Sequence, residues 1–365
     1  MAKPLSPGQQ EKEIIANVGI TGLGSAIAAE TGGQLGEGLE AVRARGYWEL
    51  VWIRFRRDRV AVAGGIFVIL LVVFAFGGSP IAAHYLGHGP NTQFAPYCCG
   101  KKAAVVVPSL LPAGPWTTVH NPYTNKDNIL PLGAANRLGQ DEFLRLMYGA
   151  QVSLEVAIFS TIGVMIIGVL LGSIAGYYRG WADTTISRVT EITMAFPVLL
   201  FVIALAATIG DRLDKITFHG TFAEGVITLT MIFIVFGWFY PARIMRAQVL
   251  SIREKEYVEA ARMIGASDAR IIRSHVLPHL VAPMLVYSTL IVAGYVLFEA
   301  GLSFLGLGIK FDASWGKLLS DAPDFYTVRP LLMLWPGLAV LLTTLAFNLL
   351  GDGLRDAFDP RSSQH

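Results

Sequence analysis

The chain has 365 residues, of which 53% are hydrophobic and only 15% carry a charge. This balance excludes an ordinary soluble domain and indicates a membrane protein. The net charge of +2 gives no overall basic field, which argues against nucleic acid as a partner, because the basic residues cluster beside apolar runs instead.

The N-terminal part of the chain predicts a tail followed by a short interfacial helix. Residues 1–46 are rich in Gly, Ala, Gln and Glu and lack a sustained apolar stripe, so we expect a disordered cytoplasmic tail there. Residues 47–59 read YWELVWIRFRRDR, with apolar residues on one side of a helix and arginines around the rest. This pattern is typical of an amphipathic helix lying on the inner leaflet.

Six apolar runs predict an all-α domain with six transmembrane helices over residues 60–351. We place the spans at Val60–Phe76, Val152–Ala175, Ile192–Ile209, Val226–Tyr240, Val281–Leu302 and Leu331–Leu350. Pro197 interrupts the third run, which predicts a kink in that helix. A further proline, Pro241, follows the fourth run directly and predicts its end.

A long loop, residues 77–151, separates the first two spans and contains many prolines, so we expect it to be extended on the extracytoplasmic side. Cys98 and Cys99 are neighbours in this loop, and Cα atoms about 3.8 Å apart are too close for an unstrained disulfide. We expect two unpaired or loosely paired thiols, since no other residues complete a redox or metal site. His84 and His88 are four residues apart, and a solvated helix end explains them as well as a metal site does.

The distribution of Lys and Arg predicts the topology, because short cytoplasmic loops carry an excess of both. One predicted loop, residues 241–280, is especially basic. Placing it in the cytoplasm puts both termini and the tail at residues 352–365 there as well. The basic residues that support this choice are Arg54–Arg59, Arg179, Arg188, Arg243, Arg246, Arg253, Lys255, Arg262, Arg270 and Arg273.

The most polar stretch between two spans runs from Glu256 to Pro278 and predicts a helix, a sharp bend and a second short helix. The first helix has a small apolar stripe at helical spacing, formed by Tyr257, Ala260, Ala261 and Ile264. Gly265 can adopt the left-handed conformation that ends a helix. Ser267 and Asp268 can cap and charge a second helix from Ser267 to His275, which Pro278 should end.

Motifs for chemistry are sparse. The two Gly-Lys pairs, at Gly100 and Gly316, lack the other residues of a phosphate-binding loop, so the chain is not expected to bind ATP in that way. Glu299 is the clear ionisable residue inside a predicted span. A structural role is the favoured interpretation, and a role in proton coupling is the alternative.

Part of the polar stretch resembles a known signature. Glu259-Ala260-Ala261, followed by Gly265 and then by Leu277-Pro278, is similar to the EAA signature in membrane subunits of bacterial ATP-binding-cassette (ABC) importers. In that family the loop carries a coupling helix that sits in a groove of the ATPase subunit. His275 departs from the signature, where isoleucine is common, but the pattern of helix, bend and helix is intact.

Longer matches lie nearer the C-terminus. Together they resemble the C-type permeases of dipeptide, oligopeptide or nickel ABC importers, and the resemblance covers roughly residues 47–361. The matching stretches are FEAGLSFLGLG at residues 298–308, DASWGK at 312–317, PGLA at 336–339, FNLLGDGLRD at 347–356 and Asp359-Pro360. The segment from Leu132 also resembles these permeases, although Ala134, Ala135 and Gln140 replace the usual acidic and arginine residues.

The resemblance implies a type I ABC importer permease fold in a bacterial cytoplasmic membrane. Its implied partners are a homologous second permease, two ATPase subunits that bind ATP and Mg²⁺, and an extracytoplasmic substrate-binding protein. It implies no cofactor, metal ligand or catalytic residue in this chain. Coupling to the ATPase is implied for Glu259, Ala260, Ala261, Gly265, Ala266, Ser267, Asp268, Ile271, Ile272, Leu277 and Pro278.

The favoured function is therefore a channel-forming subunit that moves di- and oligopeptides inward by alternating access, driven by a separate ATPase. A nickel importer is one alternative, and an ion-coupled carrier that uses Glu299 is another. A membrane enzyme would need a catalytic set, and no such set stands out. The sequence assigns neither the transported molecule nor the residues that line its path.

Overall fold

The computed structural model describes residues 47–94, 114–121, 126–136, 138–216, 225–309 and 312–359. The predicted tail at residues 1–46 and the pair Cys98 and Cys99 lie outside the described residues. The chain divides into two compact units, residues 1–50 and 51–365. Among the described residues of the second unit, four helices are long and apolar enough to cross a membrane, and six spans result if two bent helix pairs each count as one.

The first span is longer than predicted. Helix α3 (Tyr47–Arg57) precedes it, and Asp58 caps α4 (Arg59–Val73) by accepting hydrogen bonds from the next turn. A π-helical turn, η1 (Phe74–Gly78), then joins α4 to α5 (Ser79–Leu86), so one helical path runs past the predicted end at Phe76. A π turn widens a helix without ending it.

The segment between α5 and α6 contains a small hairpin rather than extended chain alone. Strands β1 (Thr117–Asn121) and β2 (Lys126–Leu130) pair antiparallel. A solvated helix end was one explanation for His84 and His88; it holds for His84, which is exposed, but not for His88. The ring of His88 is buried, and its Nε2 lies 2.9 Å from Oδ2 of Asp141 because the start of α6 packs beside it.

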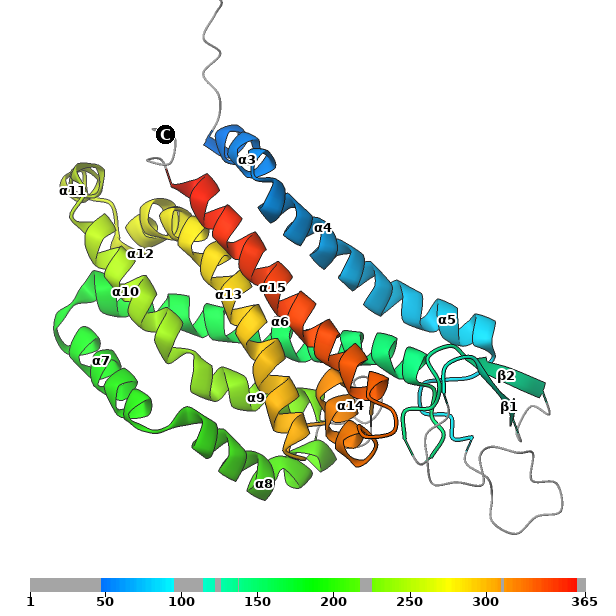
Figure 1. The fold of residues 1–365 in the computed structure, drawn as a ribbon. Helices are drawn as coiled ribbons and strands as arrows, with labels where there is room; N and C mark the ends of the chain where they lie inside the picture. The colour runs from blue at the N-terminus through cyan, green and yellow to red at the C-terminus, as the bar shows by residue number, and fades with distance from the viewer. Residues whose placement is uncertain are drawn as a thin grey trace, which may run out of the picture. The chain divides into compact units, whose positions relative to one another are not determined.

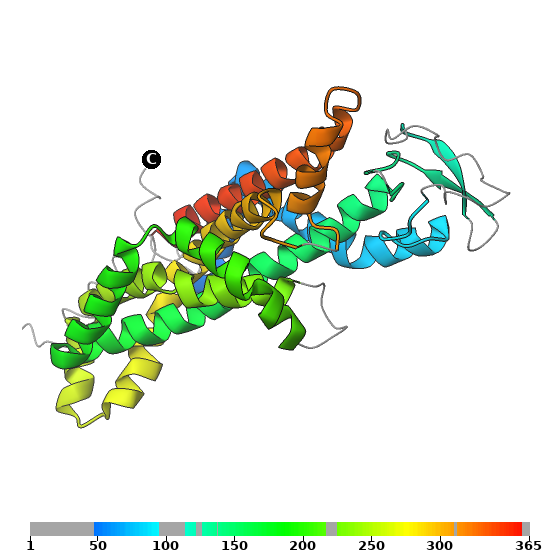
Figure 2. The same cartoon turned by 90° about the horizontal axis from the view of Figure 1, so that it is seen from below.

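Helix α6 (Glu142–Tyr178) is the longest element among the described residues, with 37 residues. It begins well before the predicted Val152 because Asp141 caps it, with Oδ1 accepting from the backbone N–H of Phe143 at 2.8 Å. The predicted loop at residues 77–151 is therefore shortened by helix at both ends. Figures 1 and 2 show the hairpin and helix α11 (Glu256–Met263) at opposite ends of α6.

Two bent pairs replace the predicted third and fourth spans. Helices α7 (Gly180–Ala195) and α8 (Val198–Ile216) meet at 80°, while α9 (Val226–Gly237) and α10 (Phe239–Arg253) meet at 42°. Pro197 thus produces a break rather than a kink. The short cytoplasmic loop expected around Arg179 and Arg188 is largely helix α7, and α8 continues beyond the predicted end of the third span at Ile209.

Pro241 does not end the fourth helix, contrary to the prediction. It sits in the first turn of α10, where the missing backbone N–H would have no helical partner in any case. The basic loop predicted at residues 241–280 therefore begins as helix and remains mostly helical.

A seam of three glycines joins α6 to α10. Gly168, Gly172 and Gly176 recur every four residues on one side of α6. An added Cβ would come within 2.6 Å of the Pro241 Cβ, 2.5 Å of the Ala242 carbonyl oxygen and 2.8 Å of the Arg246 carbonyl oxygen, respectively. Small residues allow such close backbone approach between helices in a membrane.

The last spans pack beside one another. Helix α13 (Leu277–Phe304) contacts both α6 and α15 (Leu331–Phe358), and α4 contacts the other side of α15 (Figure 1). Between them, short helix α14 (Trp315–Asp321) packs against α6, α13 and α15. Helix α15 continues beyond the predicted end at Leu350, so the predicted tail at 352–365 is helical as far as Phe358.

Candidate functional site

The bend after α11 has the geometry that glycine was predicted to provide. Gly265 has a φ of +84°, in the left-handed region, which confirms the prediction for that residue. The backbone N–H of Gly265 donates to the Arg262 carbonyl at 3.1 Å, and that of Ala266 donates to the Ala261 carbonyl at 3.0 Å. These two bonds form a Schellman motif, which satisfies carbonyls that the end of the helix would otherwise leave unpaired.

The apolar stripe predicted on α11 is divided between two environments. Ala261 is buried beside Val258, and both belong to a cluster that includes Met245 and Val249 of α10. The other stripe residues are exposed, including 86% of the surface of Ile264. Because Met263 is also 82% exposed, the tip of the bend carries two adjacent apolar side chains that the described residues leave uncovered.

The second helix differs from the prediction. Helix α12 (Asp268–Ile271) is short, and the π-helical turn η2 (Ile272–Val276) continues it directly into α13. Ser267 occupies the N-cap position, but its side chain makes no capping hydrogen bond. Pro278 does not end a helix, because it falls in the first turn of α13, immediately after the wider π turn.

The predicted coupling residues therefore fall into two groups. The exposed group can meet a partner, whereas the second group packs wholly or partly inside this chain. Exposed are Glu259, Ala260, Gly265, Ser267, Asp268 and Pro278; buried or half-buried are Ala261, Ala266, Ile271, Ile272 and Leu277.

Tyr177, near the end of α6, anchors the bend, and the sequence reasoning missed it. Its buried hydroxyl donates to Oδ1 of Asp268 at 2.7 Å. The guanidinium carbons of Arg253 and Arg262 lie 5.8 and 5.9 Å from the centre of its ring, within the range of cation–π contacts. The one sequence signal is an aromatic residue at the end of an apolar run, which alone does not identify these partners.

A second contact ties α11 to the start of α13. The ring of Tyr257 stacks on that of His279, with centroids 5.5 Å apart and planes inclined by 17°. The bend is thus held on both sides, by α6 through Tyr177 and by α13 through His279.

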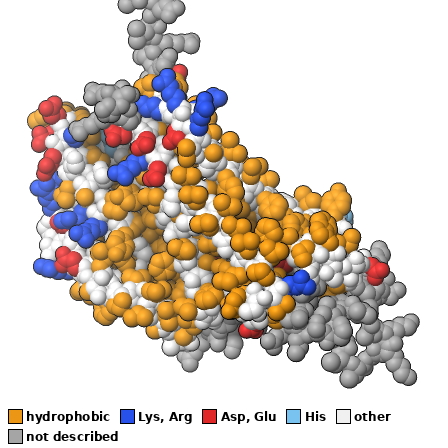
Figure 3. Space-filling model, viewed as in Figure 1, with side chains coloured by type: hydrophobic (Ala, Val, Ile, Leu, Met, Phe, Trp, Pro, Cys, Tyr) orange, Lys and Arg blue, Asp and Glu red, His pale blue; other side chains and the backbone are white. Residues whose placement is uncertain are grey.

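Charged side chains surround this end of the bundle. In Figure 3 they gather over the end that carries α7, α10 and α11, whereas the surface over the long helices is mainly hydrophobic. Arg246 of α10 makes a bidentate ion pair with Asp183 of α7, and Arg179 pairs with Glu254. These pairs connect α10 and its C-terminal end to α7 and to the junction between α6 and α7.

Glu299 lies elsewhere, in a fully buried site between α6 and α13. Its carboxylate oxygens accept hydrogen bonds from the hydroxyls of Ser153 and Ser303, each at 2.7 Å. The Ser153 hydroxyl oxygen in turn lies 3.3 Å from the backbone N–H of Trp315 in α14. The carboxylate therefore links three helices, which favours the structural interpretation of Glu299.

Comparison with known families matches two parts of the chain. Residues 168–364 match the family described as binding-protein-dependent transport system inner membrane component. Residues 46–97 match the N-terminal transmembrane domain of oligopeptide transport permease C. The bend, both bent pairs and α13 to α15 all fall within the first match.

Three curated permeases are similar to this chain over 61–86% of its length. The glutathione transport system permease protein GsiD of Pectobacterium atrosepticum is 36% identical over 315 residues, covering 86% of this chain and 91% of that protein. The dipeptide transport system permease protein DppC of Alkalihalophilus pseudofirmus is 41% identical over 224 residues, covering 61% and 69%. A putative peptide transport system permease protein of Brucella suis is 39% identical over 260 residues, covering 71% and 83%.

Among solved structures, an inward-facing conformation of the MetNI methionine ABC transporter is similar, with a TM-score of 0.48, 18% identity, and coverage of 59% of this chain and 96% of that one. The family match spans more than half of this chain, and the first relative extends over most of it. The chain is therefore a multi-pass membrane protein of the binding-protein-dependent transport system inner membrane component family, and within it a C-type permease of an ABC importer.

Proposed function

We propose that this chain is the channel-forming permease subunit of an ATP-driven peptide importer. Three similar permeases are named for glutathione, dipeptide or peptide transport, and they cover most of this chain. The transported molecule is accordingly a di- or oligopeptide, which enters the cytoplasm by alternating access.

The bend at Gly265 is the contact through which the ATPase drives this subunit. The observation that carries this proposal is the pair of exposed apolar side chains, Met263 and Ile264, at the tip of a bend fixed by a Schellman motif. Exposed apolar side chains on a rigid projection beyond the apolar surface favour a protein partner. The anchors at Tyr177 and His279 would pass movement of the tip to α6 and α13.

The working complex contains a homologous second permease, two ATPase subunits and an extracytoplasmic substrate-binding protein. ATP and Mg²⁺ bind to the ATPase subunits, and this chain carries out no covalent chemistry. We further propose that each bent pair forms one span, which gives six, and that both termini and the Gly265 bend are cytoplasmic. The basic residues near α10 and α11 support this orientation.

The test is reconstitution of the complete complex in proteoliposomes, with a labelled dipeptide outside and ATP enclosed. Uptake should require ATP, the binding protein and this subunit together, and radioactive nickel should not accumulate. Ile264→Asp should reduce both assembly with the ATPase and uptake, whereas the matched exposed substitution Tyr85→Asp, far from the bend, should not. Uptake driven by a proton gradient without ATPase subunits would contradict the proposal and favour an ion-coupled carrier.

A further inference from the structure

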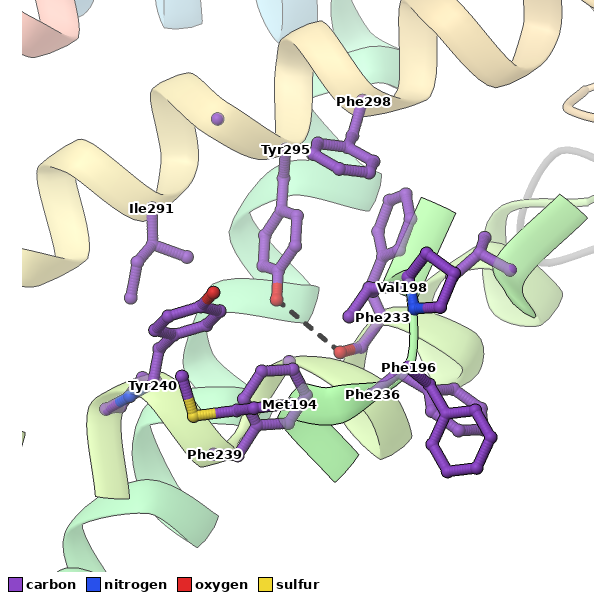
Figure 4. Close-up of a pocket in the computed structure, with 15 residues that line it drawn as sticks. Met194, Phe196, Val198, Phe233, Phe236, Phe239, Tyr240, Ile291, Tyr295 and Phe298 are labelled. Carbon is purple, nitrogen blue, oxygen red and sulfur yellow. Dashed lines mark hydrogen bonds between the residues drawn. The ribbon is translucent and has the colours of Figure 1, made fainter. Parts of the chain in front are cut away.

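The two bent pairs converge on one cavity of about 580 Å³ (Figure 4). Phe196, Pro197 and Val198 reach it from the break between α7 and α8, and Gly237 and Phe239 reach it from the break between α9 and α10. Helix α13 closes a third side with Tyr295 and Phe298. The places where both helical paths are interrupted therefore face the same space.

Aromatic rings form much of the lining. Tyr295 stacks on Phe233, with centroids 4.8 Å apart and planes inclined by only 4°, and Phe298 meets Phe233 edge-on at 6.3 Å. Figure 4 shows Tyr295 pointing from α13 toward Phe233, with Met194 and Phe196 across the hollow. The cavity opens to the surface, since 57% of Phe196 and 57% of Tyr240 remain exposed.

The breaks add backbone groups to this apolar lining. Phe196 is extended, with φ −84° and ψ 139°, as expected before a proline, and Pro197 has no N–H to donate. At membrane depth, non-helical backbone is tolerated where it is buried in protein or lines a water-filled cavity. Discontinuous helices that meet inside a membrane are also a recurrent setting for transported ligands.

A smaller basic cavity of about 190 Å³ continues the path between α7 and α10. Met194 lines both cavities, and Arg243 and Arg246 line the smaller one. Arg246 already pairs with Asp183, so Arg243 is the cationic side chain in this lining that can meet a ligand carboxylate. Glu191 lines it too, but its carboxylate pairs with Arg188 at 2.8 Å. The combined lining complements a ligand with bulky apolar groups, amide groups and a carboxylate. An acyl chain alone would use only the aromatic part.

We propose that the aromatic cavity receives the bulky apolar side chains of a peptide as it crosses the membrane, and that it favours peptides rich in aromatic and large aliphatic residues. This inference rests on the proposed function. It adds a preference that belongs to the permease itself, separate from any selection made by the binding protein.

Gly294 offers a direct test, because it lines the cavity and an added Cβ would meet nothing within 4 Å. Gly294→Leu should fill the space without displacing a neighbour. The matched control is Gly337→Leu in α15, which also replaces a helical glycine, meets only the Leu319 side chain at 4.0 Å and lies outside the lining.

The measurement compares uptake of Phe-Phe with uptake of Gly-Gly by the complete reconstituted complex, with the binding protein saturated by each peptide. Gly294→Leu should lower uptake of Phe-Phe about tenfold relative to uptake of Gly-Gly, a discrimination that a filled apolar pocket can produce. Gly337→Leu should leave the ratio of the two rates unchanged. ATPase assembly should be normal in both variants.

Four outcomes would overturn the inference. Equal loss of both peptides in Gly294→Leu with normal assembly would show that the cavity does not select side chains, and failed assembly with the second permease would identify it as a seat for that subunit. Uptake of both peptides at the rates of the unmodified complex would remove the cavity from the path. Absence of any uptake by the unmodified complex would overturn the proposed function as well, and is thereby distinguished from the other outcomes.

Discussion

The two ends of α6 are built differently. At the Trp315 end, the chain buries its contacts completely: Trp315 is 1% exposed, its Nε1 donates to the Leu146 carbonyl at 3.0 Å, and Glu299 and Ser153 are fully enclosed. At the Tyr177 end, a buried tyrosine holds partners on an exposed bend. The first arrangement fixes three helices together, whereas the second holds one projecting tip in place and leaves its surface available.

The difference shows how one long helix can serve two purposes. Buried contacts are costly to lose, because an unfilled cavity or an unpaired polar group destabilises the folded state. Contacts near the surface contribute less to the free energy of unfolding. Substitutions at the Trp315 end should therefore reduce stability, and those at the Tyr177 end should chiefly reduce coupling to the ATPase.

The largest effect is expected for Trp315→Ala, which should lower the free energy of unfolding by about 3–5 kcal/mol. The substitution leaves a cavity between α14 and α6 and frees the Leu146 carbonyl. Thermal unfolding of the purified subunit in detergent measures the loss, with exposed Trp181→Ala as control. A melting temperature equal to that of the control would contradict the view that this end is fixed by buried contacts.

Glu299→Ala comes next, with an expected loss of about 1–3 kcal/mol, because two buried serine hydroxyls lose their acceptor. Glu299→Gln is the matched control, since its amide oxygen can still accept one hydroxyl. Thermal unfolding and ATP-driven uptake should both be closer to normal in Glu299→Gln. Loss of uptake in a stably folded Glu299→Gln variant would instead point to a role for the carboxyl proton.

Gly265→Val should strain the bend by about 1–3 kcal/mol, because a β-branched residue strongly disfavours a φ of +84°. The strain can be relieved by redirecting α11 while the membrane bundle stays folded. We expect insertion to be normal and the ATP hydrolysed per peptide transported to rise. Gly265→Asn, which tolerates positive φ better, should recover part of the coupling. If Gly265→Val hydrolyses the normal amount of ATP per peptide transported, the bend is an ordinary loop with no role in coupling.

Tyr177→Phe should cost about 1 kcal/mol, since it removes the hydrogen bond to Asp268 but keeps the ring between Arg253 and Arg262. Hydrogen exchange of residues 263–270 should become faster, while that of α13 should not change. Tyr178→Phe, on the neighbouring exposed residue, is the control. Equal rates of hydrogen exchange in the Tyr177→Phe and Tyr178→Phe variants would show that Tyr177 does not anchor the bend.

The smallest effect is expected for Glu259→Ala, which changes an exposed residue on α11 and keeps the helix intact. Stability should change by less than about 0.5 kcal/mol. Any loss should appear as weaker binding of the ATPase subunit, measured in pull-down of the detergent-solubilised complex. Destabilisation comparable to that of Glu299→Ala would reverse the contrast between the two ends.

The sequence predicted those features that depend on local chemistry. Apolar runs located the four long apolar helices, and the special conformation of Gly265 followed from the need to end a helix. It misjudged Pro241 and Pro278 because a proline in the first turn of a helix, or after a π turn, is compatible with a continuing helical path. Proline alone does not distinguish these settings from a helix end.

Features that depend on distant residues could not be read from local pattern. On the side of α11 that packs against α10, Val258 is buried in place of most residues of the predicted stripe. Tyr177 is important because its hydroxyl donates a hydrogen bond to Asp268. Glu299 is important because it accepts a hydrogen bond from Ser153 on another helix. The aromatic cavity likewise exists only because two breaks in separate spans meet beside α13.

The glycine seam between α6 and α10 has a mechanical consequence. Two helices whose backbones touch at three successive turns resist sliding, because any shift drives a carbonyl oxygen against a Cα. A displacement applied at Ile264 is therefore not lost by sliding of α10 along α6. We expect it to change the angle between α9 and α10, which is 42° and has its joint at Trp238. We propose that the pair moves as one stiff unit, so that a short displacement of the bend changes the angle at this joint, which borders the aromatic cavity.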